Sequence, residues 1–294
     1  ESDRIVNYVL HIAILITLYI ILGQSLNLLV GFTGLLSLAH AAFFGLGAYV
    51  STLLMIRADW PFLAATGGGC LVAMTLSLVV AVPSLRLRGD FFVLATLGFQ
   101  MIIFSVFNNW TEVTRGPYGI AGIPKPKVFG LTAHTLPQFV ILACLIVILV
   151  LVVHWRLTST PYGRTLKAIR DQETAARALG KNVLWFKTSV FMIAGGVAAI
   201  AGALYAGYVT YIDPTSFTLD ESIFILTIVI VGGAGNLRGP VIGAFVLVLL
   251  PEALRFLHVP DTVAPNLRQI IYGILLITMM RFRPSGLAGQ YAFD

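Results

Sequence analysis

Long apolar runs recur along the whole chain and limit its fold more than any other feature does. A helix that crosses the hydrocarbon core of a bilayer needs roughly 20 mostly apolar residues. Six runs come close to this length or exceed it, at residues 5–29, 38–55, 62–82, 91–107, 138–155 and 186–212. Three shorter runs follow at residues 222–231, 241–257 and 267–280. The pattern predicts an all-α polytopic membrane protein with about eight to ten hydrophobic helices, including broken or short segments, in one transmembrane domain over residues 1–294.

The composition excludes a soluble globular protein. Hydrophobic residues make up 58% of the chain and charged residues 11%, and the mean hydropathy is +0.91. The net charge of +6 lies in loops and at the ends of runs, where basic residues orient a membrane protein, so it implies no nucleic-acid partner. Cys70 and Cys144 both lie within apolar runs and indicate neither a disulfide nor a metal site. The first run has no signal-peptide cleavage pattern, so we interpret it as a span.

The longest polar interval within the apolar sequence, residues 156–187, is strongly basic. Two acids, Asp171 and Glu173, are outnumbered there by Arg156, Arg164, Lys167, Arg170, Arg177, Lys181 and Lys187. Basic loops between spans are retained on the cytoplasmic side of the membrane. Strict alternation then predicts an outside N-terminus, an outside loop at residues 108–137 and an outside acidic connector with Asp213, Asp220 and Glu221. An upstream helix would instead place the native N-terminus inside, and the basic residues of the loop at 108–137 do not fit its outside location. The same alternation puts four other basic residues inside with the C-terminus: Arg86, Arg88, Arg281 and Arg283.

Two glycine-rich breaks, at residues 31–35 and 232–237, each follow an apolar run and precede another helix. Glycine-interrupted segments in corresponding halves of a chain point to a transporter's binding site, although this likeness is short enough to arise by chance. The polar residues at the breaks are therefore candidates for the substrate pathway: Thr33, Ser37, His40 and Asn236. For His40, a histidine at a helix start, bonded to the backbone or to Ser37, is the favoured alternative.

Small residues recur every four positions in the run at 186–212, which places them on one side of a helix. Small residues let helix backbones approach closely in a membrane, either within one chain or at a subunit interface or moving gate. The candidates for this role are Gly195, Ala198, Ala199, Gly202, Ala203 and Gly207.

No segment carries the spacing of a catalytic, metal or nucleotide site. The nearest approach to a phosphate-binding loop, residues 175–182, lacks the first glycine and the final serine or threonine. ATP and Mg would therefore bind to partner subunits, and this chain is expected to hold no cofactor. The absence of a chain of buried acids counts against an ion-coupled carrier, and no convergent histidine, cysteine and carboxylate cluster supports an enzyme. Glu252 and Arg255, three positions apart, are explained by a local pair or by interfacial anchoring.

Four motifs together resemble one protein family. Residues 173–180 (ETAARALG) are similar to the EAA loop of ABC importer permeases, although Thr174 is an insertion and the later proline of many such loops is missing. Residues 37–49 (SLAHAAFFGLGAY), 88–92 (RGDFF) and 232–240 (GGAGNLRGP) complete the set. The four resemble the branched-chain amino acid ABC transporter permease family, in its LivM-type subunit.

The resemblance implies a function, a set of partners and a coupling site. A LivM-type permease works with a related LivH-type permease, two cytoplasmic ATPase subunits and an extracytoplasmic substrate-binding protein, in lipid of the bacterial inner membrane. Its ABC importer permease fold would use residues 156–187 as a cytoplasmic coupling loop, with Glu173, Ala176, Arg177 and Gly180 as the ATPase-coupling residues. Leucine, isoleucine and valine are the implied substrates. Other amino acids, urea or amides, and an ATPase-independent ion-coupled carrier or channel, remain as alternatives.

Overall fold

The computed structural model describes residues 2–85, 90–128, 131–133, 135–256, 264–283 and 285–289. Within this part of the chain, six helices are long and apolar enough to cross a membrane, which confirms the all-α polytopic prediction. They are α1 (Ser2–Thr33), α2 (His40–Arg57), α3 (Phe62–Ser84), α4 (Asp90–Asn109), α6 (Leu136–Ser159) and α9 (Val183–Val209). Three further apolar helices follow: α10 (Leu219–Gly232), α11 (Arg238–Phe256) and α12 (Ala264–Phe282).

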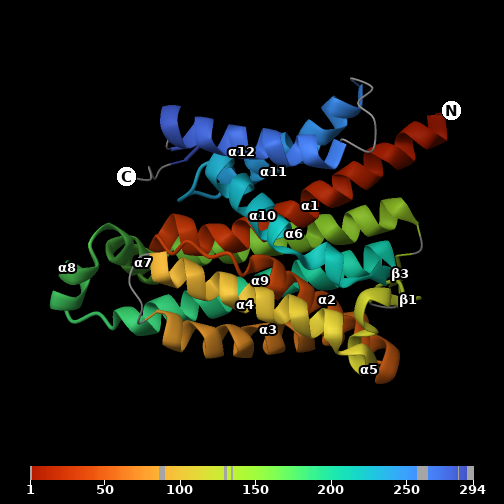
Figure 1. The fold of residues 1–294 in the computed structure, drawn as a ribbon, viewed down its shortest axis with the longest axis horizontal. Coiled ribbons are helices and arrows are strands. Elements are labelled where there is room, and N and C mark those ends of the chain that lie inside the picture. Colours follow the sequence, from red (N-terminus) through yellow and green to blue (C-terminus); the bar gives the residue numbers. More distant parts are fainter. Residues whose placement is uncertain are drawn as a thin grey trace.

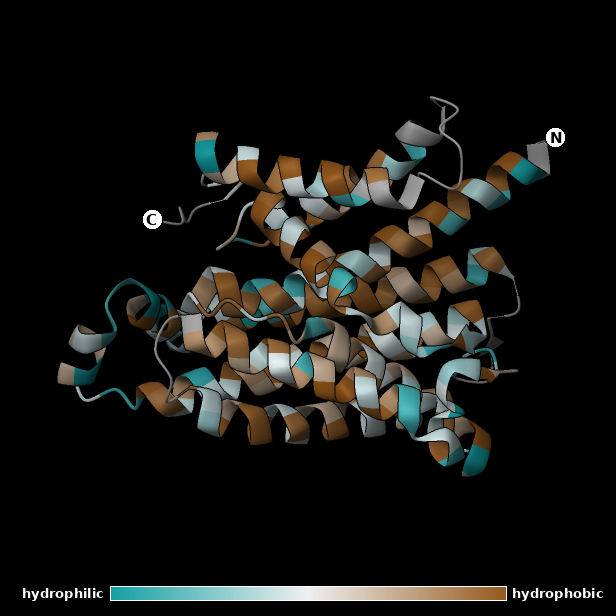
Figure 2. Ribbon diagram, in the orientation of Figure 1, coloured by the Kyte–Doolittle hydropathy of each residue, from teal (hydrophilic) through white to brown (hydrophobic). Residues whose placement is uncertain are grey.

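The long helices lie side by side, and their connections gather at two ends (Figure 1). One end, here called the basic end, carries α7 (Pro161–Asp171) and α8 (Glu173–Ala178). The other, here called the loop end, carries α5 (Thr111–Thr114), η1 (Gly116–Tyr118), η2 (Pro214–Phe217) and the four strands. Apolar residues dominate the long helices, and hydrophilic residues collect around α7 and α8 (Figure 2).

Two short antiparallel ladders tie the loop end together. β1 (Ile120–Ala121) pairs with β4 (Tyr211–Ile212), and β2 (Lys127–Val128) pairs with β3 (Leu131–Thr132). The loop at 108–137 therefore meets the segment before the acidic connector, as the predicted alternation requires. Arg86 and Arg88 lie outside the described residues, as does the start of the motif at 88–92.

Helix ends follow from identifiable residues. Thr135 and Gln138 form a capping box at the start of α6, and the Asn182 side chain accepts a bond from the Trp185 N–H at 3.1 Å at the start of α9. The prediction ended the first helix before Gly31, but α1 continues to Thr33 and stops where Gly34 takes a positive φ of 68°. A single glycine is tolerated inside a well-packed helix, whereas left-handed backbone ends one.

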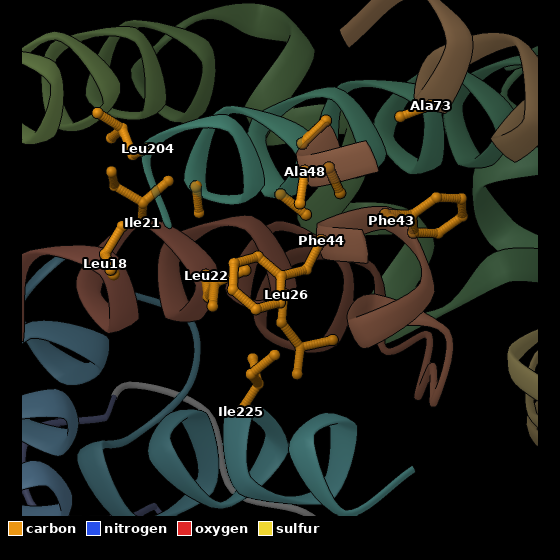
Figure 3. Close-up of a cluster of buried hydrophobic side chains, with 14 of the residues drawn as sticks. Leu18, Ile21, Leu22, Leu26, Phe43, Phe44, Ala48, Ala73, Leu204 and Ile225 are labelled. Carbon is orange, nitrogen blue, oxygen red and sulfur yellow. The ribbon is translucent and has the colours of Figure 1, made fainter. Parts of the chain in front are cut away.

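The core lies where α1, α2, α9 and α10 meet (Figure 3). Leu22 and Leu26 of α1 lie near Phe44 of α2 and Ile225 of α10 in this cluster, all of them buried. α2 and α9 approach so closely that a Cβ on Gly202 would collide with the Phe44 carbonyl. All six predicted small residues of α9 are buried within this chain, where they allow the helices to pack closely.

Helices α10, α11 and α12 form a layer along α1 (Figure 1). The sequence predicted a ten-residue segment before the second break, but α10 spans 14 residues and includes Gly232. It ends at Gly233, which has a φ of 105°, and α11 begins at Arg238. A Cβ on Gly233 would also collide with the backbone of Gly289, so the turn requires glycine for two reasons.

Candidate coupling site

The basic interval folds into two helices, of which α7 lies against the bundle. Thr160 is extended, and Pro161 then opens α7 at the first helical position, where proline is well tolerated. Its buried residues recur every three positions, which places them on one face of the helix: Gly163, Leu166 and Ile169. The Tyr162 hydroxyl lies 2.8 Å from the Ser189 hydroxyl of α9, and burial raises the pKa of Tyr162. α7 is thus held against the bundle by its buried face and by a hydrogen bond to α9.

Arg170 and Lys167 join α7 to the end of α1. The Arg170 Nη1 donates to the Gly31 carbonyl at 2.6 Å, and its Nε donates to Asp171 Oδ1 at 2.8 Å. The Lys167 Nζ lies 5.3 Å from the centroid of the Phe32 ring, within the range of a cation–π contact. Sequence reasoning counted both residues only as charge, because their partners lie more than 130 positions earlier.

α8 is a short helix with a defined end. Gln172 is extended and separates it from α7. At the other end Gly180 has a φ of 76°, its N–H donates to the Arg177 carbonyl at 2.9 Å, and the Lys181 N–H donates to the Ala176 carbonyl at 3.1 Å. This bond pair is a Schellman motif, which glycine favours because it tolerates left-handed backbone. The predicted helix and its glycine terminator are therefore present.

A small hydrophobic cluster holds α8 on α7 and α9. Ala176 is buried and packs with Ile169, Val183 and Phe186, apart from the main core. Ala176 thus faces the chain itself. A buried alanine can act on a partner only by positioning α8.

Glu173 anchors the base of α8 by ion pairs. Its carboxylate accepts from the Lys187 Nζ at 2.7 Å and also pairs with Arg177, one turn later on the same helix. Partial burial alone would raise the pKa of Glu173, but the Lys187 and Arg177 charges outweigh it and hold that pKa below its usual value. Glu173 is therefore ionised at neutral pH and ties α8 to α9.

The tip of α8 presents an apolar side chain that sequence reasoning did not select. Leu179 is 79% exposed, although it lies between the polar residues of the basic interval. Arg177 beside it is also exposed. The sequence carries one sign of this site, because Leu179 is a large apolar residue among polar ones at the end of a helix. Only the structure shows that its side chain points away from the chain.

The four predicted pathway residues mostly complete helix ends. The Thr33 hydroxyl donates to the Leu29 carbonyl at 2.7 Å, and the Ser37 hydroxyl accepts from the Ala39 N–H at 3.3 Å. Asn236 accepts from the Gly239 N–H at 2.7 Å and donates to the Ala288 carbonyl. His40 is fully buried beside Phe43, and its ring lies next to the Ser25 backbone, whereas a bond to Ser37 does not form. Four cavities of the described part are lined by other residues.

The two glycine breaks lie against each other. The Asn27 side chain accepts from the Gly235 N–H at 2.9 Å and donates to the Asn236 carbonyl at 2.8 Å. A Cβ on Gly31 would collide with the Gly235 N–H, so glycine is needed there for close approach. The Arg170 side chain donates to the Gly31 carbonyl, so one hydrogen bond links α7 to this junction.

Comparisons with known proteins agree with the fold and the motifs. Residues 8–280 match the family model described as branched-chain amino acid transport system / permease component. The high-affinity branched-chain amino acid transport system permease protein LivM of Escherichia coli (strain K12) is 36% identical, over 94% of this chain and 69% of that protein. A probable LivM of Methanocaldococcus jannaschii is 25% identical, over 74% of this chain and 65% of that protein.

The name of a more distant relative indicates a different kind of transported molecule. The autoinducer 2 import system permease protein LsrC of Salmonella paratyphi B is 26% identical, over 65% of this chain and 56% of that protein. No solved structure matches the chain. The family match covers nearly the whole membrane domain, and the LivM likeness is the stronger of the two. The chain therefore belongs to the branched-chain amino acid transport permease family, as a multi-pass, non-catalytic permease component of an ABC transporter.

Proposed function

We propose that this chain is one of two permease subunits in an ATP-driven importer of the bacterial inner membrane. It moves branched-chain or other hydrophobic amino acids inward by alternating access. The LivM name and 36% identity of the Escherichia coli relative support amino acids, against 26% for the autoinducer 2 permease. Urea or amides have no such support.

The proposed partners follow from this role. A LivH-type permease completes the pathway, an extracytoplasmic binding protein delivers the substrate, and two ATPase subunits supply the energy. ATP and Mg belong to the ATPases. The basic end is then cytoplasmic, with residues 156–187 as the coupling loop, and the loop at 108–137 is extracytoplasmic.

The geometry of α8 is the observation that carries the proposal. Its base is fixed by the Glu173–Lys187 ion pair and by buried Ala176, whereas its tip exposes Arg177 and Leu179. A surface that transmits force needs both a rigid base and a free contact face. Gly180 sets the direction of the chain as it leaves α8. We assign Glu173, Ala176 and Gly180 as positioning residues, and Arg177 with Leu179 as the ATPase contact.

A substitution at Gly180 tests this assignment in the reconstituted importer. Gly180→Val forces a β-branched residue into left-handed backbone and should misdirect the tip, whereas Gly180→Asn tolerates that backbone. Apart from the two neighbouring residues in the chain, no atom of the described residues lies within 4 Å of the Cβ position, so the variants differ in their backbone preference and not in a contact at Cβ. We expect Gly180→Val to lower leucine uptake per ATP hydrolysed and Gly180→Asn to preserve it. Equal coupling in both variants would contradict the assignment, and leucine uptake by this chain alone without ATP would instead support an ion-coupled carrier.

A further inference from the structure

An open cavity of about 580 Å³ lies between α1, α10, α11 and α12, in the half of the molecule nearer the loop end. Its walls are mostly apolar, with Ile12, Leu15, Phe224 and Leu276 among them. This volume is within the usual range for small-molecule sites, which are apolar pockets with a few placed polar groups. The cavity is thus large enough for an amino acid.

In the described part of the chain, the cavity is lined by acidic side chains without a basic counterpart. Asp220, Glu221 and Glu252 line it, and no lysine, arginine or histidine is among its described lining residues. Glu252 accepts a hydrogen bond from the Tyr8 hydroxyl. Glu252 thus has a contact besides the local pair with Arg255 or the interfacial anchoring that the sequence suggested, and the Arg255 side chain lies outside the described residues. An electronegative apolar pocket favours a ligand with a positive group and an apolar body.

Glu221 carries an oxygen that nothing in the described protein satisfies. Its Oε1 is buried without a hydrogen-bond partner, while the carboxylate interacts with the Tyr19 hydroxyl. A buried acceptor left unpaired is unfavourable, and a bound donor would remove that penalty. A metal ion is a poor candidate, because the described residues hold no group of three or more metal-ligating side chains.

Glu221 and Tyr19 also line a second, smaller cavity of about 150 Å³. That cavity lies deeper in the bundle and is lined by Phe44, Tyr205 and Ser216 as well. Leu15, Tyr19 and Glu221 therefore separate an open outer cavity from an inner one. A cation held at Glu221 would lie at the passage between them.

We propose that the outer cavity binds the ammonium group of an aliphatic amino acid at Glu221 and Tyr19, with the aliphatic side chain against the apolar walls. The inference rests on the proposed function, and it assigns the site that binds the substrate's ammonium group during transport. The lining offers no cation for the substrate carboxylate, so that group faces the open side of the cavity. There the second permease would complete the site.

The test uses the assembled transporter in lipid nanodiscs without binding protein. The probes are 3-methylbutylamine, which has the ammonium and the branched chain, and 4-methylpentanoate, which has the branched chain and a carboxylate. We expect the amine to raise the unfolding midpoint in a saturable manner and the carboxylate to have no effect. Glu221→Gln should weaken amine binding by about tenfold or more, since a charge-assisted contact is lost. Glu112→Gln, at an exposed site on α5, is the matched control and should bind as the wild type does.

Tyr19→Phe is the second variant, because it keeps the packing of the ring and removes the hydroxyl. It should also weaken amine binding while the assembly remains intact. Equal binding of amine and carboxylate, or wild-type amine binding in both Glu221→Gln and Tyr19→Phe, would overturn the inference. ATP-driven leucine uptake by a transporter that shows no amine effect would overturn it too, and would leave the proposed function standing.

Discussion

Arg170 keeps only 11% of its side-chain surface exposed, although it belongs to the most polar segment of the chain. It donates to the Gly31 carbonyl and to Asp171 in a fixed geometry. We predict that Arg170→Ala lowers the free energy of unfolding by roughly 1.5–3 kcal/mol, the usual contribution of a hydrogen bond to a charged group. Arg170→Lys should recover part of it, because lysine keeps the charge without the planar fork. Thermal unfolding of the detergent-purified chain checks this, with exposed Arg164→Ala as the control; equal midpoints in all variants would contradict it.

Glu173 and Lys187 form a pair that titration and mutation can isolate. The Glu173 side chain is 35% exposed, so a double-mutant cycle with Glu173→Gln and Lys187→Met should give a coupling of about 0.5–1 kcal/mol. The pKa of Glu173 is lowered in the fold, so the coupling is complete above the ordinary carboxyl pKa of about 4.3 and is lost as pH falls through the lowered value. Cycles measured by thermal unfolding at neutral pH and at mildly acidic pH should agree. A coupling that disappears well above the ordinary pKa would refute the pairing.

Residues whose role depends on nearby sequence were predictable, and those with distant partners were not. Gly180 follows a helix-favouring stretch, so its place at the end of α8 could be read from the chain. Arg170 and Asn27 act through residues more than 130 and 200 positions away, respectively. For His40 the sequence suggested a bond to the backbone or to Ser37, and the fold buries its ring next to the Ser25 backbone without a bond to Ser37.

The α2–α9 contact depends on glycine at the crossing point. A Cβ on Gly202 would lie 2.7 Å from the Ala48 backbone nitrogen, and the Phe44 carbonyl is closer still. Neither neighbour is a flexible side-chain end, so we predict that Gly202→Ala separates the helices and destabilises the chain by roughly 1–3 kcal/mol. Gly67→Ala in α3 is the matched control, because no atom lies within 4 Å of its Cβ position. It should leave stability unchanged or raise it by up to about 1 kcal/mol. Unfolding midpoints of both variants in detergent test this prediction. A Gly202→Ala variant with an unchanged midpoint would disprove the tight crossing of α2 and α9.

Element types were predictable where apolar runs were long, and element ends were less so. The six long helices match the predicted runs to within a few residues, because twenty apolar residues in a row have few alternatives in a membrane. The segment before Gly232 was underestimated by treating all glycines as breaks. Only Gly34, Gly233 and Gly235 among the glycines of these two breaks have positive φ, so only they depart from helical backbone there.

The arrangement of the whole chain predicts its sidedness. α8 and the loop at 108–137 lie at opposite ends (Figure 1), so a membrane-impermeant maleimide should reach them from opposite sides. We expect Arg177→Cys to label from the cytoplasm and Tyr118→Cys, at an 86% exposed site, to label from outside. The test needs a background without Cys70 and Cys144. Labelling of both sites in intact cells would contradict the proposed topology.

The sequence predicted the likeness of the two glycine breaks but not the hydrogen bonds that join them. Their likeness suggested related positions, and the fold brings Gly31 and Gly235 together. Neither the hydrogen bonds of Asn27 nor the layer of α10, α11 and α12 along α1 leaves a periodic signal, because both depend on tertiary packing. The cavity that holds Glu221 is likewise a product of four helices and appears in no single segment.

The central claim is that α8 transmits the work of a separate ATPase, and Leu179 tests it most directly. Its side chain is 79% exposed, so Leu179→Asp should leave the fold and the unfolding midpoint of the chain intact. Burying a carboxylate where an apolar side chain makes the contact is costly, so the variant should lose the ATPase. The measurement is ATP-driven leucine uptake in proteoliposomes, with the amount of co-purified ATPase. The account predicts an intact chain, little bound ATPase and little uptake, whereas wild-type binding and uptake would contradict it.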